Sequence, residues 1–140
     1  MTTEKNKWID AVGKLLKLTQ ERRLKWEPHS PPSYLNREPD RKRVDVVYEA
    51  QHNDRTLRLF QLSYKIEKPS SLNVLRDLNV YLEGREYPYW ENRTVLQLLD
   101  QTRSDAWTFP NTEVLDDLLA AVRYQVSGVK EFLDELAAAS

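Results

Sequence analysis

The sequence predicts an α+β domain in which an antiparallel meander sheet of four or five strands carries an N-terminal helix and a C-terminal helix on one face. Segments near both ends of the chain have apolar residues at helical spacing, whereas the middle alternates apolar and polar residues with the period of a strand. Two amphipathic helices and a half-polar sheet bury their apolar surfaces in two layers when both helices lie on the same face. The 140 residues have the length of one domain, so we expect a single domain over residues 1–140.

The first helix is expected over residues 4–22, and a loop over residues 27–43. One apolar face predicts the helix, and four prolines, which lack a backbone N–H and disfavour helix, predict the loop. The apolar face consists of Trp8, Val12, Leu15, Leu16 and Thr19. Trp26, between the two segments, is expected in the core.

The sheet is expected to begin with a hairpin of residues 44–50 and 56–66. In the first strand, alternate residues from Val44 to Ala50 share the apolar face. The turn contains Asn53 and Asp54, which tolerate a positive φ. In the second strand the apolar positions change phase after Leu59, which predicts a β-bulge.

Residues 67–86 are interpreted as an insertion with a short strand at 78–82. Two further strands are expected at 94–100 and 106–109.

The closing helix is predicted after Pro110, with Asn111 or Thr112 as its cap. Its apolar seam has a 4-3-4-3 spacing: Leu115, Leu119, Val122, Val126, Val129, Leu133 and Leu136. Gly128 interrupts the seam at a cost of about 1 kcal/mol relative to alanine, which indicates close packing or a slight bend there. Leu118, Tyr124 and Phe132 fall at the edge of the seam or beyond it, which predicts that this helix also contributes to a homodimer. The other interpretation is that the first helix packs beside the closing helix and hides these side chains.

The composition argues against several kinds of chemistry. There is no cysteine, the two histidines (His29 and His52) lie apart from other metal ligands, and three glycines do not make a phosphate-binding loop. We therefore expect no cofactor, no metal and no catalytic residue. The lack of cysteine, of a signal core and of a long apolar run favours a cytoplasmic protein without a membrane segment.

The net charge of −1 is unevenly distributed, with +5 over residues 1–43 and −6 over the rest. One interpretation is a nucleic-acid binder that uses the basic first helix with Arg41, Lys42 and Arg43. The favoured interpretation is that the two halves attract each other or that the charges are solvated, so a nucleic-acid partner is not expected.

Carboxylates supply a second alternative, an accessory enzyme or nuclease-like domain with a site of dispersed acidic residues. Asp45 and Glu49 are expected on one strand face, and Asp40-Arg41-Lys42 matches half of a metal-dependent nuclease motif. An outward polar face of the strand is enough to explain Asp45 and Glu49. The nuclease motif is incomplete, because the acidic residue expected on a strand upstream of Asp40 is missing.

An aromatic run, Tyr87-Pro88-Tyr89-Trp90, is a candidate for partner binding. Adjacent aromatic residues on a strand point to opposite faces, so they cannot all lie in one core. Exposed Tyr and Trp anchor protein interfaces and can also stack on nucleobases. Packing within the protein remains the other interpretation.

Several segments along the chain carry a resemblance to other proteins, and a Trp-x-Phe-Pro turn before the closing helix is their distinctive part. They are Trp8-Ile9-Asp10-Ala11-Val12, Leu18-Thr19, Leu24-Lys25-Trp26, Val47-Tyr48-Glu49-Ala50, Leu57-Arg58-Leu59-Phe60, Ala106-Trp107-Thr108-Phe109-Pro110, Leu115-Asp116-Asp117-Leu118-Leu119 and Val122-Arg123-Tyr124-Gln125-Val126. In these segments the chain resembles a set of small uncharacterised bacterial proteins, common in cyanobacteria, that are interpreted as helix–meander–helix domains. The resemblance implies a bacterial origin and no particular activity.

The order of elements is also similar, more weakly, to type III secretion chaperones, which are homodimeric α+β proteins of acidic character.

These observations favour a non-enzymatic protein-interaction or regulatory module of a bacterial cytoplasm. Its partner is expected to be another protein or a second copy of the chain. The candidate partner-binding residues are Tyr87, Tyr89, Trp90, Tyr124 and Phe132.

Overall fold

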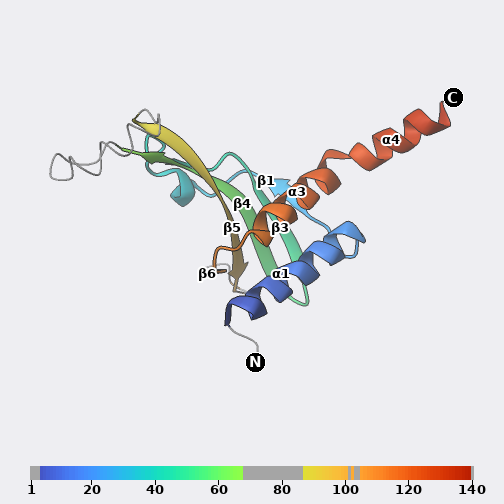
Figure 1. Ribbon diagram of the computed structural model, residues 1–140, viewed down its shortest axis with the longest axis horizontal. Helices are drawn as coiled ribbons and strands as arrows, with labels where there is room; N and C mark the ends of the chain where they lie inside the picture. Colours follow the sequence, from blue (N-terminus) through green and yellow to red (C-terminus); the bar gives the residue numbers. More distant parts are fainter. Residues whose placement is uncertain (1–3, 68–86, 101, 103–104, 140) are drawn as a thin grey trace.

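The computed structural model describes residues 4–67, 87–100, 102 and 105–139, and it has the α+β fold that the sequence predicts (Figure 1). The helices are α1 (Glu4–Gln20), α3 (Val114–Ser127) and α4 (Val129–Ala138), with a short 3-10 helix η1 (Ser33–Asn36). The strands are β1 (Glu27–His29), β2 (Lys42–Arg43), β3 (Val47–His52), β4 (Arg55–Ile66), β5 (Tyr89–Leu99) and β6 (Ala106–Thr108). The strand expected at 78–82 lies outside the described residues.

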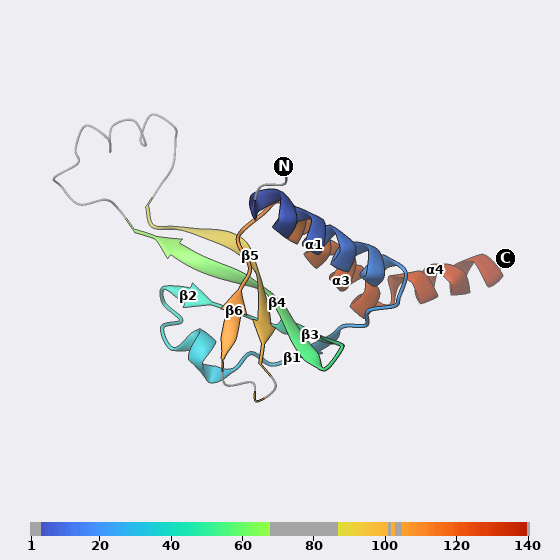
Figure 2. The same cartoon turned by 90° about the horizontal axis from the view of Figure 1, so that it is seen from below.

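The sheet is antiparallel, in the order β1-β3-β4-β5-β6. Strand β2 pairs with the far half of β4, the half away from the β3–β4 turn. Helices α1 and α3 lie side by side on one face of the sheet, as predicted (Figure 2). The apolar sides of both helices meet the inner face of the sheet in one cluster. Its buried members are Val12, Leu24, Trp26, Ala50, Leu57, Leu59, Leu96, Leu115, Leu118, Leu119 and Val122.

A second apolar cluster on the opposite face of the sheet explains why the predicted β-bulge is absent. Strand β4 pairs with β5 without interruption, from Thr56 opposite Leu99 to Ile66 opposite Tyr89. Leu59 faces the helices, whereas Phe60 faces the second cluster, so the apolar residues change phase because both faces of the strand are covered. That cluster contains Val44, Val47, Phe60 and Val95, with Leu35 and Leu62 packed against it.

The segment 27–43, predicted as a loop, contains two short strands and η1. The side chain of Asn36, at the end of η1, donates to the carbonyl of Val44 and accepts from its N–H, both at 2.9 Å. This pair of hydrogen bonds seats Leu35 over the second cluster. Strand β3 therefore begins at Val47 rather than at residue 44, and Val44 packs on the face opposite Ala50.

The hairpin turn has the predicted positive φ angles, 50° at Asn53 and 68° at Asp54. The predicted helix cap is wrong, because α3 begins at Val114 after Glu113, and no side chain caps it. The closing helix is also not continuous. Gly128 has a φ of 73° and separates α3 from α4, so the glycine marks a helix break and not a close contact.

Candidate interaction surface

Helix α4 extends beyond the sheet and beyond α1, and none of its residues is buried (Figure 1). The seam of α3 packs on the core, but its continuation does not, because α1 ends at Gln20, where α4 begins to project (Figure 2). Phe132 is 57% exposed and Leu136 is 55% exposed. The large apolar side chains that face solvent on or next to α4 are Tyr124, Val129, Phe132, Leu133 and Leu136.

An ion pair orients the base of α4. Arg22 follows α1 with a φ of 61°, and its guanidinium donates to Glu131 Oε1 at 2.6 Å. The hydrogen bond from Arg22 lowers the pKa of the Glu131 carboxyl, and the same bond raises the pKa of Arg22. The apolar side of α4 remains uncovered by this contact, because Arg22 meets the helix at its polar side.

A groove of about 470 Å³ lies at the base of α4, between the ends of α1 and α3. Its walls combine the ring of Tyr124 with the cationic side chains of Arg22 and Lys130. Gln125 also lines the groove, and its side-chain amide donates to the carbonyls of Thr19 and Leu24, which holds this lining in place. The groove is therefore a fixed concave surface next to the exposed apolar helix.

The predicted partner-binding residues divide between two places. Tyr124 and Phe132 are exposed near α4, whereas Leu118, predicted at the edge of the seam, is buried under α3. Tyr87 and Tyr89 are half-buried against each other, with ring centroids 5.2 Å apart. They lie at the other end of the molecule, at the start of β5, so one surface does not unite the five residues (Figure 1).

Trp90 is exposed, but its ring is covered by a cation. The guanidinium carbon of Arg43, from β2, lies 4.2 Å from the centroid of the Trp90 ring. This cation–π contact stabilises the pairing of β2 with the long β4–β5 hairpin. Part of the aromatic run thus packs within the protein.

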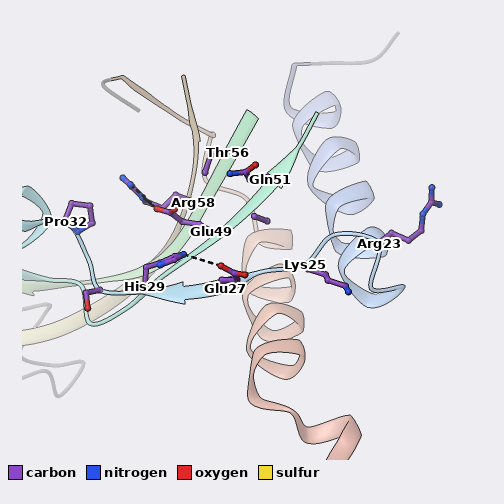
Figure 3. Close-up of a pocket in the computed structure, with 11 residues that line it drawn as sticks. Arg23, Lys25, Glu27, His29, Pro32, Glu49, Gln51, Thr56 and Arg58 are labelled. Atoms are coloured by element: carbon purple, nitrogen blue, oxygen red, sulfur yellow. Dashed lines mark hydrogen bonds and ion pairs between the residues drawn. The ribbon is translucent and has the colours of Figure 1, made fainter. Parts of the chain in front are cut away.

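A larger pocket, about 770 Å³, lies along the β1 edge of the sheet (Figure 3). Arg58 and Glu49 face each other there, with Nη2 to Oε2 at 3.1 Å, and their side chains are only 6% and 10% exposed. Arg58 also donates to the Tyr34 hydroxyl at 2.8 Å. Because Glu49 already neutralises the charge of Arg58, the pair gives this face a rigid polar floor and not a free anion-binding group.

This buried pair belongs to a polar row that crosses the whole sheet. The register places one polar residue per strand side by side: Glu27, Glu49, Arg58, Gln97 and Thr108. The row was not predicted, because it depends on strand register, which links residues far apart in the chain. Its signal in the sequence was a single arginine, Arg58, among apolar strand residues.

The residues considered for acid–base, metal or nucleic-acid chemistry are not brought together. Asp45 precedes β3, so it does not pair with Glu49, which binds Arg58 instead. His29 lies 3.8 Å from Glu27 at the exposed β1 edge, and His52 is exposed at the β3–β4 turn. Within residues 4–67, 87–100, 102 and 105–139, no three potential metal ligands cluster.

The two basic segments lie apart. Strand β2 (Lys42–Arg43) pairs with the far half of β4, whereas α1 covers the half next to the hairpin turn (Figure 2). They do not form the continuous basic stripe that the nucleic-acid interpretation requires.

A third exposed aromatic group lies at the N-terminal end of α1. The ring centroid of Trp107, on the edge strand β6, lies 4.8 Å from that of Trp8 in a tilted contact and 5.2 Å from that of Phe109 in an edge-to-face contact. Trp8 is half-buried, less than predicted, because its ring packs on this edge strand and not deep in the core. The cluster fastens β6 to α1.

Comparison with known proteins found no matching family model, no similar curated protein and no similar solved structure. Among the helices that the structure describes, none is both long and apolar enough to cross a bilayer. The surface around α4 must therefore be interpreted from its own geometry.

Proposed function

We propose that this chain is a non-enzymatic protein-interaction module of a bacterial cytoplasm, and that it docks on its partner through α4. The observation that carries the proposal is the exposure of four large apolar side chains on one helix that has no buried residue. Tyr124 and the groove at the base of α4 extend this apolar surface toward the body of the protein.

The energetics of a short helix support the proposal. An isolated helix of fewer than about 12 residues is marginal in water, and most helical stability in proteins comes from packing of an apolar face. Helix α4 has 10 residues and a single ion pair to the rest of the described structure, Arg22 with Glu131. A partner that covers Phe132 and Leu136 supplies the missing packing, at about 25 cal/mol per Å² of apolar surface removed from water.

The composition of α4 also suits docking. Its polar side carries Lys130, Glu131, Asp134 and Glu135, so the apolar stripe is bordered by charges. An apolar centre with a polar rim is the usual anatomy of a protein interface. The enzyme alternative has no comparable support, since the buried carboxylate of Glu49 is neutralised by Arg58.

Site-specific photo-crosslinking in cells of the host tests the proposal. A photoreactive residue at position 132 should give a discrete adduct that disappears when Leu136→Glu is added. The same residue at position 134, on the polar side of α4, is the matched control and should give little adduct. Equal labelling at both positions, or an adduct at 132 that survives Leu136→Glu, would contradict docking through the apolar side.

A further inference from the structure

We propose that α4 binds α4 of a second copy of this chain, with the two helices antiparallel about a two-fold axis near Phe132 and Leu133. The inference rests on the proposed function, because it names the partner for the same exposed apolar side. Three features of the described residues favour a second copy: the symmetry of the stripe, the distribution of charge and the size of the surface.

The apolar stripe is symmetric about its own midpoint. Val129, Phe132, Leu133 and Leu136 follow the spacing i, i+3, i+4, i+7, with which helices pack side chains into each other's gaps. Reversal of the helix exchanges Val129 with Leu136 and Phe132 with Leu133. A two-fold interface requires a surface that is complementary to itself in this way.

The charges of α4 favour the antiparallel direction. The base of the helix is cationic, with Lys130 on α4 and Arg22 bound to Glu131, whereas its outer half carries Asp134 and Glu135. Within one helix, Lys130 and Asp134 form an exposed i,i+4 ion pair at 3.4 Å, which an antiparallel partner extends across the interface. Antiparallel pairing places the acidic outer half of each helix beside the cationic base of the other. Parallel pairing would set the acidic halves against each other, which is destabilising.

The segment that precedes the base strengthens this complementarity. Residues 17–25 hold four basic residues and one acidic residue, whereas α4 holds one basic and three acidic residues. A helix of 10 residues is about 15 Å long, so the outer end of the partner's α4 reaches the groove beside Tyr124. Leu136 of the partner then packs on Val129, next to this groove.

The small size of the surface also favours a symmetric pair. Half-exposed side chains of this size present roughly 90 Å² each, so the five on or next to α4 offer about 450 Å² per copy. Because each copy contributes the same surface, the pair removes about 900 Å² of apolar surface from water before the charged rim is counted. This total approaches the roughly 1,200 Å² at the lower end of specific interfaces.

Cysteine crosslinking tests both the partner and the direction, and the chain has no cysteine of its own. In the proposed pair, residue 133 lies next to its own symmetry mate, whereas the two copies of residue 136 are about 10 Å apart along the axis, beyond the reach of a disulfide. Mild oxidation should therefore give a disulfide-linked dimer of Leu133→Cys but no disulfide-linked dimer of Leu136→Cys. The double variant Val129→Cys/Leu136→Cys should crosslink again, because these positions meet across the axis. Efficient crosslinking of Leu136→Cys alone would overturn the antiparallel arrangement.

Light scattering coupled to size exclusion tests the pair without crosslinks. At about 100 μM, above the micromolar Kd expected of a small interface, the parent should have twice the chain mass of 16.6 kDa. Phe132→Glu should raise the Kd at least about a hundredfold, whereas Ala138→Glu, which adds the same charge to the other side of α4, should change it less than about threefold. A monomeric parent would overturn the inference. The photo-crosslinking at position 132 would then still decide whether another protein binds α4.

Discussion

At the scale of single residues, Gln125 joins the two helices of the core. Its side chain accepts a hydrogen bond from the Trp26 N–H at 2.8 Å and donates to the carbonyls of Thr19 and Leu24, at 3.1 and 2.9 Å. Nearby, the Trp26 indole donates to the Thr19 hydroxyl at 3.0 Å. The chain changes direction sharply after α1, and the side-chain amide of Gln125 satisfies three backbone groups of this turn.

Gln125→Ala should therefore lower the free energy of unfolding by about 2–4 kcal/mol, because partly buried backbone donors and acceptors lose their partner. Chemical denaturation measures the change. Gln20→Ala, at the exposed last residue of α1, is the control and should change stability by less than about 0.5 kcal/mol. Equal effects of the two substitutions would mean that the hydrogen bonds of Gln125 do not stabilise the fold.

The ion pair of Arg58 and Glu49 gives a second prediction at this scale. Removal of one partner leaves an uncompensated buried charge, so Arg58→Met or Glu49→Met alone should cost about 3–5 kcal/mol. The double variant should cost less than the sum of the two, since no charge remains unpaired. Additive effects in the denaturation experiments would show that the two side chains do not interact.

At the scale of elements, the helix ends are set by backbone conformation as much as by apolar spacing. Gly13 lies inside α1, where the methyl group of an alanine would have no atom within 4 Å. Gly128, in contrast, has a left-handed backbone between α3 and α4. The seam from Leu115 to Leu136 predicted one helix, because its spacing does not change at the break. The sequence indicated close packing or a slight bend at Gly128, whereas the left-handed backbone that ends α3 there is visible only in the folded chain.

The two glycines should respond to alanine in opposite directions. Gly13→Ala should stabilise the protein by about 0.5–1 kcal/mol, because glycine is a poor helix former. Gly128→Ala should destabilise it by about 1–2 kcal/mol, because alanine is strained at a φ of 73°. Thermal unfolding of both variants measures the difference. A stabilising effect at position 128 would indicate that α3 and α4 can join into one straight helix.

At the scale of the whole molecule, local patterns predicted the α+β class and long-range contacts decided the rest. The helical and strand periods predicted α1, α3, the β3–β4 hairpin and the one-sided packing of α1 and α3, because these signals lie within short segments. The strand pairings of segment 27–43 depend on partners in β3 and β4, so the sequence pattern missed them. The predicted β-bulge was wrong because two apolar clusters, and not one, cover β4.

The candidate surface was predictable only in part. Tyr124 and Phe132 lie off the core-facing seam, and both are exposed, whereas Leu118 is buried because α3 turns it toward the sheet. The exposure of Val129, Leu133 and Leu136 could not be predicted, since they continue the seam of a buried helix. That exposure follows from the length of α1, which ends before it can cover α4.

The proposed binding through the apolar side of α4 is tested most directly by backbone hydrogen exchange at several protein concentrations. We predict that the amides of α4 exchange slowly at high concentration and rapidly after dilution, while the amides of β4, buried in the sheet, do not change. Phe132→Glu should show rapid exchange in α4 at every concentration. Slow exchange in α4 that is independent of concentration, with no partner added, would contradict the account, because the helix would then be stable without any contact to its apolar side.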